Sequence, residues 1–366
     1  MQLSITREVL LKPLQQIIGA VERRQTMPAL SNLLLCGNDQ GLSITATDLE
    51  VELVASLDME IEDQGAITIP ARKLLDICRS LPDQAMIVIS TSNEKIKVSS
   101  GRSRFSLASL PAEDFPTIDD LELDQNVVIK EGDFKSLVEK SSFAMAQQDV
   151  RYYLNGLLLE LDEGQIRAVA TDGHRLALSQ LEHKSDIKGS RQIILPRKGV
   201  QELLRLLSHE NKEITVAIGK NHLRVNLANL QFTSKLIDGR FPEYQRVLPE
   251  ESENRAKIDK VLFKQALTRA SILSNEKYKG IRLILDNNTM VIQAHNPEHE
   301  EAEEEIEILY TGDRLEVGFN VVYLLDVLNA LESDSVEIII QDANSSALIV
   351  SSESQASRYV VMPMRL

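Results

Sequence analysis

The feature that most constrains the fold of this chain is a threefold internal repeat. Three segments share an apolar, strand-like run that leads into a polar turn: LSITATDLEVEL (42–53), IRAVATDGHRLAL (166–178) and MVIQAHNPEHEEA (290–302). The turn residues Asp48, Asp172 and Asn296 follow one another at intervals of 124 positions. Matching segments at constant spacing are the signature of a repeated structural unit. The sequence therefore predicts three homologous units of about 120 residues, a common size for one domain.

Further blocks recur in each unit and extend the repeat over the chain. A helix-like stretch opens each unit: TREVLLKPLQQI (6–17), EGDFKSLVEKSSF (131–143) and DKVLFKQALTRAS (259–271). A strand-then-helix block follows each turn: ITIPARKLLDIC (67–78), IILPRKGVQELLRLL (193–207) and EVGFNVVYLLDVL (316–328). A later strand-like segment of each unit carries an aromatic residue. These residues are Phe105, Phe232 and Tyr359, and they are 127 positions apart. Strands interleaved with two helices per unit predict an α+β fold built on antiparallel sheets.

The repeat also predicts where the chain divides. We expect domains at 1–123, 124–252 and 253–366, with the acidic stretches DDLELDQN (119–126) and PEESENRAK (249–257) as linkers. Pro13 lies inside the first predicted helix, where it removes a backbone donor, so we expect a kink or a break there.

Basic residues recur on the predicted helices although the chain is acidic. The net charge of −15 argues against a uniformly basic nucleic-acid-binding protein. However, Arg72 and Arg79 are seven positions apart, as are Lys198 and Arg205, so each pair shares one helix face. Basic faces without base-reading groups suit sequence-independent contact with phosphates. An amphipathic helix with an ordinary solvated side is the alternative for each helix taken alone.

The first and third units carry opposite charges. Arg102 and Arg104 alternate with Phe105 and Leu107 on one predicted strand of the first unit, whereas residues 297–307 of the third unit are rich in glutamate. This complementarity predicts a head-to-tail contact between copies, which closes into a ring when the rotation allows. A solvated acidic edge that discourages aggregation is the alternative.

The segment TDGHRL (171–176) raises the possibility of an enzyme. Asp172 could orient His174 as a general base of a hydrolase, or the segment could be a structural turn. No nucleophile motif, phosphate-binding GxxxxGK[ST] motif or HExxH motif accompanies the pair. Because Thr47 and Asp48 repeat the Thr-Asp pair, the sequence favours a structural corner over a catalytic loop.

Two histidines of the third unit suggest a second alternative. His295 and His299 are four positions apart among glutamates and could bind a metal ion. Pro297 between them opposes a helix, and the other two units have no histidine at the equivalent positions. We expect no metal and no cofactor.

The composition indicates a protein of the cytoplasm. The N-terminal residues lack the basic and apolar regions of a signal peptide, and no apolar run approaches 18 residues. Cys36 and Cys78 are the only cysteines and are expected to be reduced core residues.

Many of these segments resemble one protein family. The chain closely resembles the bacterial DNA polymerase III beta subunit, the replicative sliding clamp, from end to end. The segments that carry the resemblance are LLKPLQQ, TDLEVE, PARKLLDICR, GRSRFSL, DVRYYLNG, ATDGHRLA, PRKGV, FTSKLIDGRFPEY, ILSNEKYKGIRL, GFNVVYLLDVLNAL and YVVMPMRL.

The resemblance implies an architecture and a function. Three clamp-type domains, each with two helices packed on antiparallel sheet, would assemble as a head-to-tail homodimer into a closed ring around duplex DNA. The ring would tether the polymerase and confer processivity without catalysis of its own. Implied partners are DNA of any sequence, the polymerase III alpha subunit, the clamp loader, and other polymerases and repair proteins that dock through short peptide motifs. A protein-only peptide-binding adaptor without DNA is the remaining alternative.

The resemblance also implies three groups of site residues. DNA contacts would fall on Arg24, Arg72, Gln148, Arg151, Tyr152, Tyr153, Arg197 and Lys198. The interface between chains would include Arg102, Arg104, Phe105, Leu107, Ile272, Leu273, Glu298, Glu300, Glu301, Glu303 and Glu304. A partner-peptide pocket between the second and third domains would be formed by Leu154, Thr171, Gly173, His174, Arg175, Leu176, Pro242, Arg246, Val247, Asn320, Tyr323, Ser346, Val360, Met362, Pro363, Met364, Arg365 and Leu366.

Overall fold

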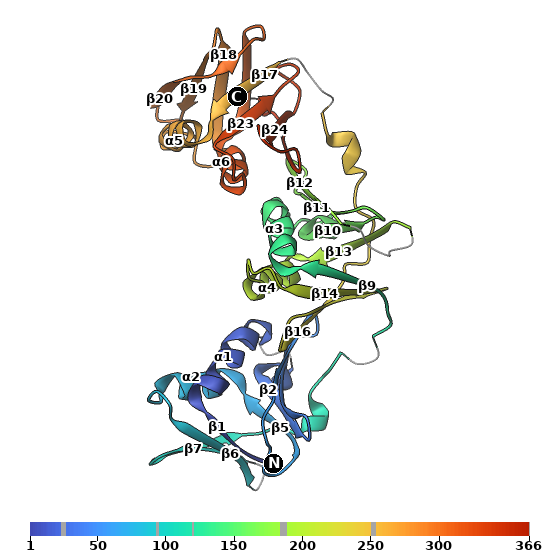
Figure 1. Cartoon of the computed structure of the whole chain (residues 1–366). Coiled ribbons are helices and arrows are strands. Elements are labelled where there is room, and N and C mark those ends of the chain that lie inside the picture. The colour runs from blue at the N-terminus through green and yellow to red at the C-terminus, as the bar shows by residue number, and fades with distance from the viewer. Residues whose placement is uncertain (23–26, 93–94, 119–120, 184–188, 250–253, 366) are drawn as a thin grey trace. The chain divides into compact units, whose positions relative to one another are not determined.

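The computed structural model describes residues 1–22, 27–92, 95–118, 121–183, 189–249 and 254–365 (Figure 1). These residues form two compact units. The first comprises Met1–Gly132 and Lys198–Leu236, and the second comprises Asp133–Arg197 and Ile237–Leu366.

The first unit contains two antiparallel sheets. The four-stranded sheet has the order β1 (Gln2–Thr6), β6 (Met86–Ser92), β7 (Lys95–Ser100) and β8 (Ser103–Ala108). The eight-stranded sheet has the order β5 (Gly65–Pro70), β2 (Asn32–Asn38), β3 (Gly41–Thr47), β4 (Val51–Leu57), β16 (Leu230–Lys235), β15 (His222–Asn226), β14 (Glu213–Gly219) and β9 (Leu123–Lys130).

The second unit repeats this plan. Its nine-stranded sheet has the order β13 (Arg191–Pro196), β10 (Gly156–Leu161), β11 (Gln165–Thr171), β12 (Arg175–Glu182), β25 (Ser357–Val361), β24 (Ala347–Ser351), β23 (Ser335–Ile339), β17 (Arg255–Asp259) and β21 (Leu309–Tyr310). Its four-stranded sheet has the order β20 (Glu301–Glu307), β19 (Thr289–His295), β18 (Gly280–Asp286) and β22 (Leu315–Asn320).

The helices begin and end close to the predicted blocks. They are α1 (Arg7–Ile17), α2 (Ala71–Ser80), α3 (Glu131–Ser142), α4 (Arg197–Leu206), α5 (Lys260–Ser271) and α6 (Val321–Ala330). Short 3-10 turns cover Ile18–Ala20, Pro28–Ser31, Ala112–Asp114, Tyr152–Asn155 and Tyr244–Val247. In α2 the residues Leu74, Leu75 and Cys78 are buried, which is the helical period of an amphipathic element. The helix α1 packs on α2, and α5 packs on α6 and against β19 and β20 (Figure 1).

Pro13 does not break the first helix, so that part of the prediction is wrong. The helix α1 continues through Pro13 to Ile17, and the Pro13 ring is buried. The carbonyl that loses its donor belongs to Val9, four residues earlier, and Val9 is 48% exposed. The helix thus lacks one backbone hydrogen bond at Pro13 without ending there.

The predicted linkers are shorter than their acidic composition indicated. Strand β9 starts at Leu123 and pairs with β14, and strand β17 starts at Arg255 and pairs with β23. In both strands, exposed residues alternate with buried or half-buried ones, and a short strand with many polar residues resembles a polar linker in sequence. Backbone hydrogen bonds of a ladder do not depend on that polarity.

The strand with the recurring aromatic residue (Phe105, Phe232 or Tyr359) joins sheets between successive repeats. Strand β16, which carries Phe232, pairs with β4 just after the Asp48 turn. Strand β25, which carries Tyr359, pairs with β12 just after the Asp172 turn. Each of these strands thus extends the sheet of the preceding repeat. The domain boundaries at 123 and 252 stay predictions.

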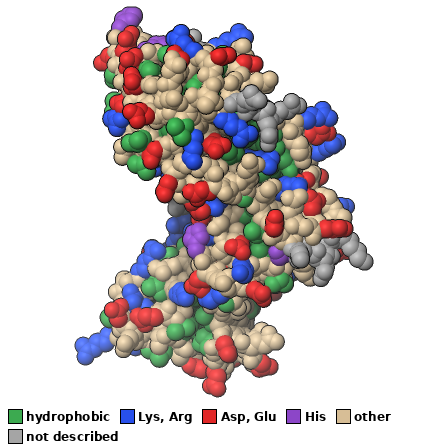
Figure 2. Space-filling model, turned by 45° about the horizontal axis from the view of Figure 1, so that its top comes forward, with side chains coloured by type: hydrophobic (Ala, Val, Ile, Leu, Met, Phe, Trp, Pro, Cys, Tyr) green, Lys and Arg blue, Asp and Glu red, His purple; other side chains and the backbone are tan. Residues whose placement is uncertain are grey.

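Charged side chains of both signs cover the surface. Figure 2 shows Lys and Arg side chains interspersed with Asp and Glu on the face that it draws. Among the described residues, no helix has the length and apolar composition that crossing a membrane requires.

Candidate functional site

The repeated Thr-Asp turn is a hydrogen-bonded corner in the structure. Asp48 Oδ1 accepts from the amides of Glu50 and Val51 at 2.9 and 2.7 Å. Asp172 Oδ1 accepts from the amides of His174 and Arg175 at 2.9 and 3.0 Å. The preceding threonines also match. Thr47 Oγ1 donates to the Val51 carbonyl at 3.0 Å, and Thr171 Oγ1 donates to the Arg175 carbonyl at 2.6 Å.

Asp172 is therefore committed to the corner rather than to catalysis. Its Oδ2 accepts from Arg175 Nε at 3.1 Å, so both carboxylate oxygens have donors from the corner itself. The third repeat has the same device, because Asn296 Oδ1 accepts from the amides of Glu298 and Glu300. Within the described part of the chain, no three His, Cys, Asp or Glu side chains cluster as metal ligands do, and His299 lies in a turn with φ of +65°.

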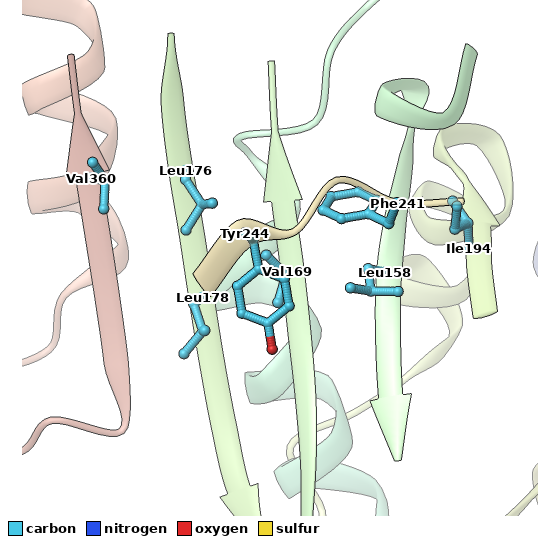
Figure 3. Packing of buried hydrophobic residues seen from close by; sticks show 8 residues of the cluster. All are labelled: Leu158, Val169, Leu176, Leu178, Ile194, Phe241, Tyr244 and Val360. Carbon is cyan, nitrogen blue, oxygen red and sulfur yellow. The ribbon is translucent and has the colours of Figure 1, made fainter. Parts of the chain in front are cut away.

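An apolar cluster lies beside this corner on the nine-stranded sheet. Strands β10 to β13 and β25 contribute aliphatic side chains, and the segment 237–248, here called the connector, contributes two aromatic ones (Figure 3). The buried members are Leu158, Val169, Leu176, Leu178, Ile194, Phe241, Tyr244 and Val360.

The cluster brings several predicted pocket residues together. Leu176 and Val360 are paired across β12 and β25, and Val247 of the connector packs against the cluster half-buried. Met362 is 38% exposed, and its amide donates to the His174 carbonyl at 2.9 Å. Exposed apolar side chains beside a packed apolar cluster suit an amphipathic peptide.

Other predicted pocket residues surround these. Leu154 is buried in a 3-10 turn, His174 and Pro242 are exposed, and exposed Arg246 pairs with Glu243. Gly173 has φ of +88°, and an added Cβ would lie 3.0 Å from Arg151 Nη2, so only glycine suits this position.

The third domain contributes through the start of α6. Asn320 caps this helix by accepting from the Val322 amide at 2.9 Å. The Met364 amide donates to the Gly318 carbonyl at 2.9 Å, which ties the terminal segment to the end of β22. Ser346 and Pro363 are half-buried and Arg365 is exposed. Leu366 lies outside the described residues.

Arg175 is enclosed rather than free at the pocket rim. Its guanidinium pairs with Asp172 and, through Nη1, with Asp326 Oδ2 at 2.5 Å. Nη2 donates to the Phe143 carbonyl at 3.0 Å, and the guanidinium lies over the Tyr323 ring at 4.5 Å. Arg175 thus links the corner to α6. Sequence reasoning missed Asp326, although it is the one charged residue in the largely apolar LLDVLNAL.

The predicted DNA contacts fall on both compact units. Arg24 lies outside the described residues. Arg72 is exposed at the start of α2 and beside Lys73, where it has no ion pair or hydrogen bond with any residue that the structure describes. Lys198 is half-exposed and forms an ion pair with Asp48 of the first corner. Arg197 donates to the Met145 carbonyl at 3.0 Å.

The loop before β10 carries the other four predicted contacts. Gln148 is exposed with φ of +57°. Tyr152 is 55% exposed and meets Tyr153 edge to face, with ring centroids 5.7 Å apart. Arg151 donates to both oxygens of Asp149, at 3.1 and 2.8 Å.

This Arg151–Asp149 pair gives a pH-dependent prediction. The Arg151 hydrogen bonds lower the pKa of Asp149 from 3.8 to about 2. A lowered pKa means that the contact is fully present above about pH 4 and is lost as the pH falls through 2. We expect the Asp149 carboxyl carbon to titrate near pH 2 in an NMR titration. A midpoint near pH 4, or the same midpoint in Arg151→Gln, would contradict the pairing.

The predicted interface residues lie on two open sheet edges. In its described residues, β8 pairs with β7 on one side and ends the sheet order on the other. Strand β20 likewise pairs only with β19. Arg102 and Arg104 are exposed at the first edge, with Phe105 half-buried and Leu107 buried.

The second edge is acidic and lies next to exposed apolar residues. Ile272 is 75% exposed just after α5, and Leu273 is half-buried. Glu304 is paired with Arg269, whereas the other four predicted interface glutamates are exposed: Glu298, Glu300, Glu301 and Glu303.

Comparison with known proteins covers the whole chain. Models of the DNA polymerase III beta subunit match at residues 1–119 (N-terminal domain), 128–243 (central domain) and 245–365 (C-terminal domain). The beta sliding clamps of Pseudomonas aeruginosa and Escherichia coli are 51% and 48% identical to this chain, over 100% of both chains in each case. A crystal structure of the Pseudomonas aeruginosa DNA polymerase III subunit beta, 50% identical, matches with a TM-score of 0.97 over 100% of both chains.

Repeated α+β domains, joined edge to edge through shared antiparallel sheets, are the architecture of a sliding clamp. The chain belongs to the DNA polymerase III beta subunit family. Its function is that of a DNA sliding clamp in replication, and the family is non-enzymatic. The hydrolase alternative for Asp172 and His174 is therefore wrong.

Proposed function

We propose that two copies of this chain close head to tail into a ring around duplex DNA. One observation carries the proposal. In the second and third repeats, the strand with the recurring aromatic residue pairs with the strand that follows the corner of the preceding repeat. Strand β16 thus pairs with β4, and strand β25 pairs with β12. The equivalent strand of the first repeat is β8, and the strand that follows the corner of the third repeat is β20. Among the described residues, each of these strands ends its sheet and has no partner of this kind. Pairing β8 with β20 of a second copy would repeat the junction found twice within the chain.

Charge and apolar surface support this pairing. Arg102 and Arg104 accompany β8, and exposed glutamates accompany β20, so opposite charges would meet. Phe105 and Leu107 would face Ile272 and Leu273, which supplies the apolar part of the contact. Head-to-tail contacts close only when the rotation allows, and two copies are the number that the family implies.

DNA contact within the ring would be electrostatic and independent of sequence. Phosphates would be bound by four basic residues: Arg24, Arg72, Arg197 and Lys198. The loop before β10 would contact the DNA through Gln148, Arg151, Tyr152 and Tyr153. Because these contacts are few, topological enclosure rather than affinity would hold the clamp on DNA.

Partner proteins would dock at the apolar cluster through short peptides. Exposed Met362 and half-buried Val247 form its accessible margin, beside buried Leu176 and Val360. The Pseudomonas aeruginosa clamp has been solved bound to griselimycin, with a TM-score of 0.97 to this chain at 51% identity. The polymerase alpha subunit, the clamp loader, other polymerases and repair proteins are the proposed partners, in the cytoplasm.

Retention on circular DNA tests the proposal. The clamp is loaded onto a nicked circular plasmid by a bacterial clamp loader, washed at 0.5 M salt and then divided into intact and linearised samples. Because salt removes electrostatic binding but not enclosure, we expect retention on the circle and loss within minutes after linearisation. Equal loss from both forms would contradict the ring and favour a peptide-binding adaptor that does not encircle DNA.

A further inference from the structure

A buried polar network lies under the connector. Glu160 on β10 is 5% exposed, and its carboxylate has three donors from different segments. Gln192 Nε2 donates at 2.7 Å, Arg167 Nη1 at 2.8 Å and the Tyr244 hydroxyl at 2.5 Å. Arg167 also pairs with Asp162 at 3.0 Å.

The Glu160 carboxyl stays ionised despite its burial. Burial alone would raise the pKa of Glu160, but the hydrogen bonds of Tyr244, Gln192 and Arg167 outweigh it and leave the pKa lowered. Burial and the adjacent carboxylate raise the pKa of Tyr244, so its hydroxyl stays protonated and donates. A charge-assisted bond of this kind is stronger than a neutral one.

Of the three donors, only Tyr244 belongs to the connector. Arg167 and Gln192 sit on β11 and β13, which flank β10 in the same sheet. The Tyr244 ring lies over Val169 and Leu178 of the sheet, with its hydroxyl pointing away from the connector (Figure 3). The Tyr244 hydroxyl is thus a directional anchor, whereas the Phe241 contact is purely apolar.

Three predicted pocket residues flank this anchor in the chain. Pro242 precedes Tyr244 by two residues, and Arg246 and Val247 follow in the same 3-10 turn. The side chains of Pro242 and Arg246 are exposed, so packing holds them less than it holds Tyr244, which is 3% exposed. Fixing Tyr244 therefore fixes the wall of the pocket that they form.

We propose that Tyr244, hydrogen-bonded to Glu160, is a positioning residue for peptide binding: it pre-organises the connector as one wall of the pocket. The inference rests on the proposed peptide-docking function. Pre-organised sites bind more tightly because less ordering remains to be done on binding.

The test compares two tyrosine-to-phenylalanine variants of the full-length protein. Tyr244→Phe removes the anchor and keeps the ring. Tyr310→Phe is the matched control, because Tyr310 is 4% exposed and donates its hydroxyl to the Asp313 carbonyl at 2.7 Å, away from the connector. The affinity for griselimycin is measured by calorimetry, well below the unfolding temperature of either variant.

We expect Tyr244→Phe to bind griselimycin about five- to tenfold more weakly than wild type, and Tyr310→Phe to bind as wild type does. Hydrogen exchange of the amides of residues 241–248 should be faster in Tyr244→Phe alone. Unchanged affinity in Tyr244→Phe, or an equal loss in both variants, would overturn the positioning role. If wild type itself does not bind griselimycin, the pocket assignment fails instead, so the two failures are distinguishable.

Discussion

Replacing Ile272 with Asp is expected to convert the protein from a two-chain assembly to single chains of 41.0 kDa. Ile272 is 75% exposed in the described chain, next to the open edge at β20, and would be covered by Phe105 and Leu107 of the second copy. A carboxylate buried against these apolar side chains would be desolvated without a partner, at a cost of several kcal/mol per interface. Because a two-chain ring contains the interface twice, both contacts fail together. Sedimentation velocity at micromolar concentration measures the mass.

Leu309→Asp supplies the matched control. Leu309 is 68% exposed in the same domain, but it lies on β21, which pairs with β17 at the end of the nine-stranded sheet and does not belong to the four-stranded sheet that ends at β20. The control is expected to keep the mass of the assembly. An Ile272→Asp protein that still sediments as two chains would refute the proposed contact of β8 with β20.

The corner shows what a repeat can reveal about chemistry. Asp172 and His174, taken alone, have the residue types of a catalytic pair. The recurrence of Thr47 and Asp48 predicted a structural turn, and the structure shows the same hydrogen bonds in both corners. A residue whose role is repeated in every unit is explained by the fold, so function has to be sought in what differs between units.

Long-range partners limited what could be predicted for the charged residues. The sequence places Lys198 on a basic helix face, but not beside Asp48, 150 positions earlier, with which it forms an ion pair. It also gave no indication that Arg175 meets Asp326, 151 positions later. Helical period locates a side chain on a face, whereas its partner depends on which elements the tertiary fold brings to that face.

The same limit applies to Tyr244 and Glu160. Tyr244 lies in the segment FPEY, which suggests no role for its hydroxyl, and Glu160 lies in an apolar strand run, GLLLEL, where a lone acid is conspicuous. A buried acid requires donors. The sequence analysis made no prediction for Glu160, and only the fold shows that its carboxylate is buried and accepts from Tyr244 of the connector.

Deleting the last five residues, 362–366, is expected to abolish griselimycin binding, with a loss of about 100-fold or more in affinity. Met362 and Met364 are tied by their amides to the His174 and Gly318 carbonyls, so the segment is held against both domains that would form the proposed pocket. Burying one methionine side chain against a ligand contributes about 1.5–3 kcal/mol. Losing two such contacts corresponds to at least the roughly 3 kcal/mol of a 100-fold change. Calorimetric titration with griselimycin measures the loss.

The truncation separates peptide binding from ring assembly because it leaves the strands intact. Strand β25 ends at Val361, so its pairing with β12 survives, and neither open edge is touched. We therefore expect the truncated protein to keep its two-chain mass and its retention on circular DNA. Met86→Ala is the control for removing an exposed methionine, since Met86 is 52% exposed on β6 and distant in sequence from every predicted pocket residue. Met362→Ala should weaken binding about tenfold, whereas Met86→Ala should leave it unchanged. Undiminished griselimycin affinity after truncation would remove the terminal segment from the pocket, and with it the reason for placing partner peptides between the second and third domains.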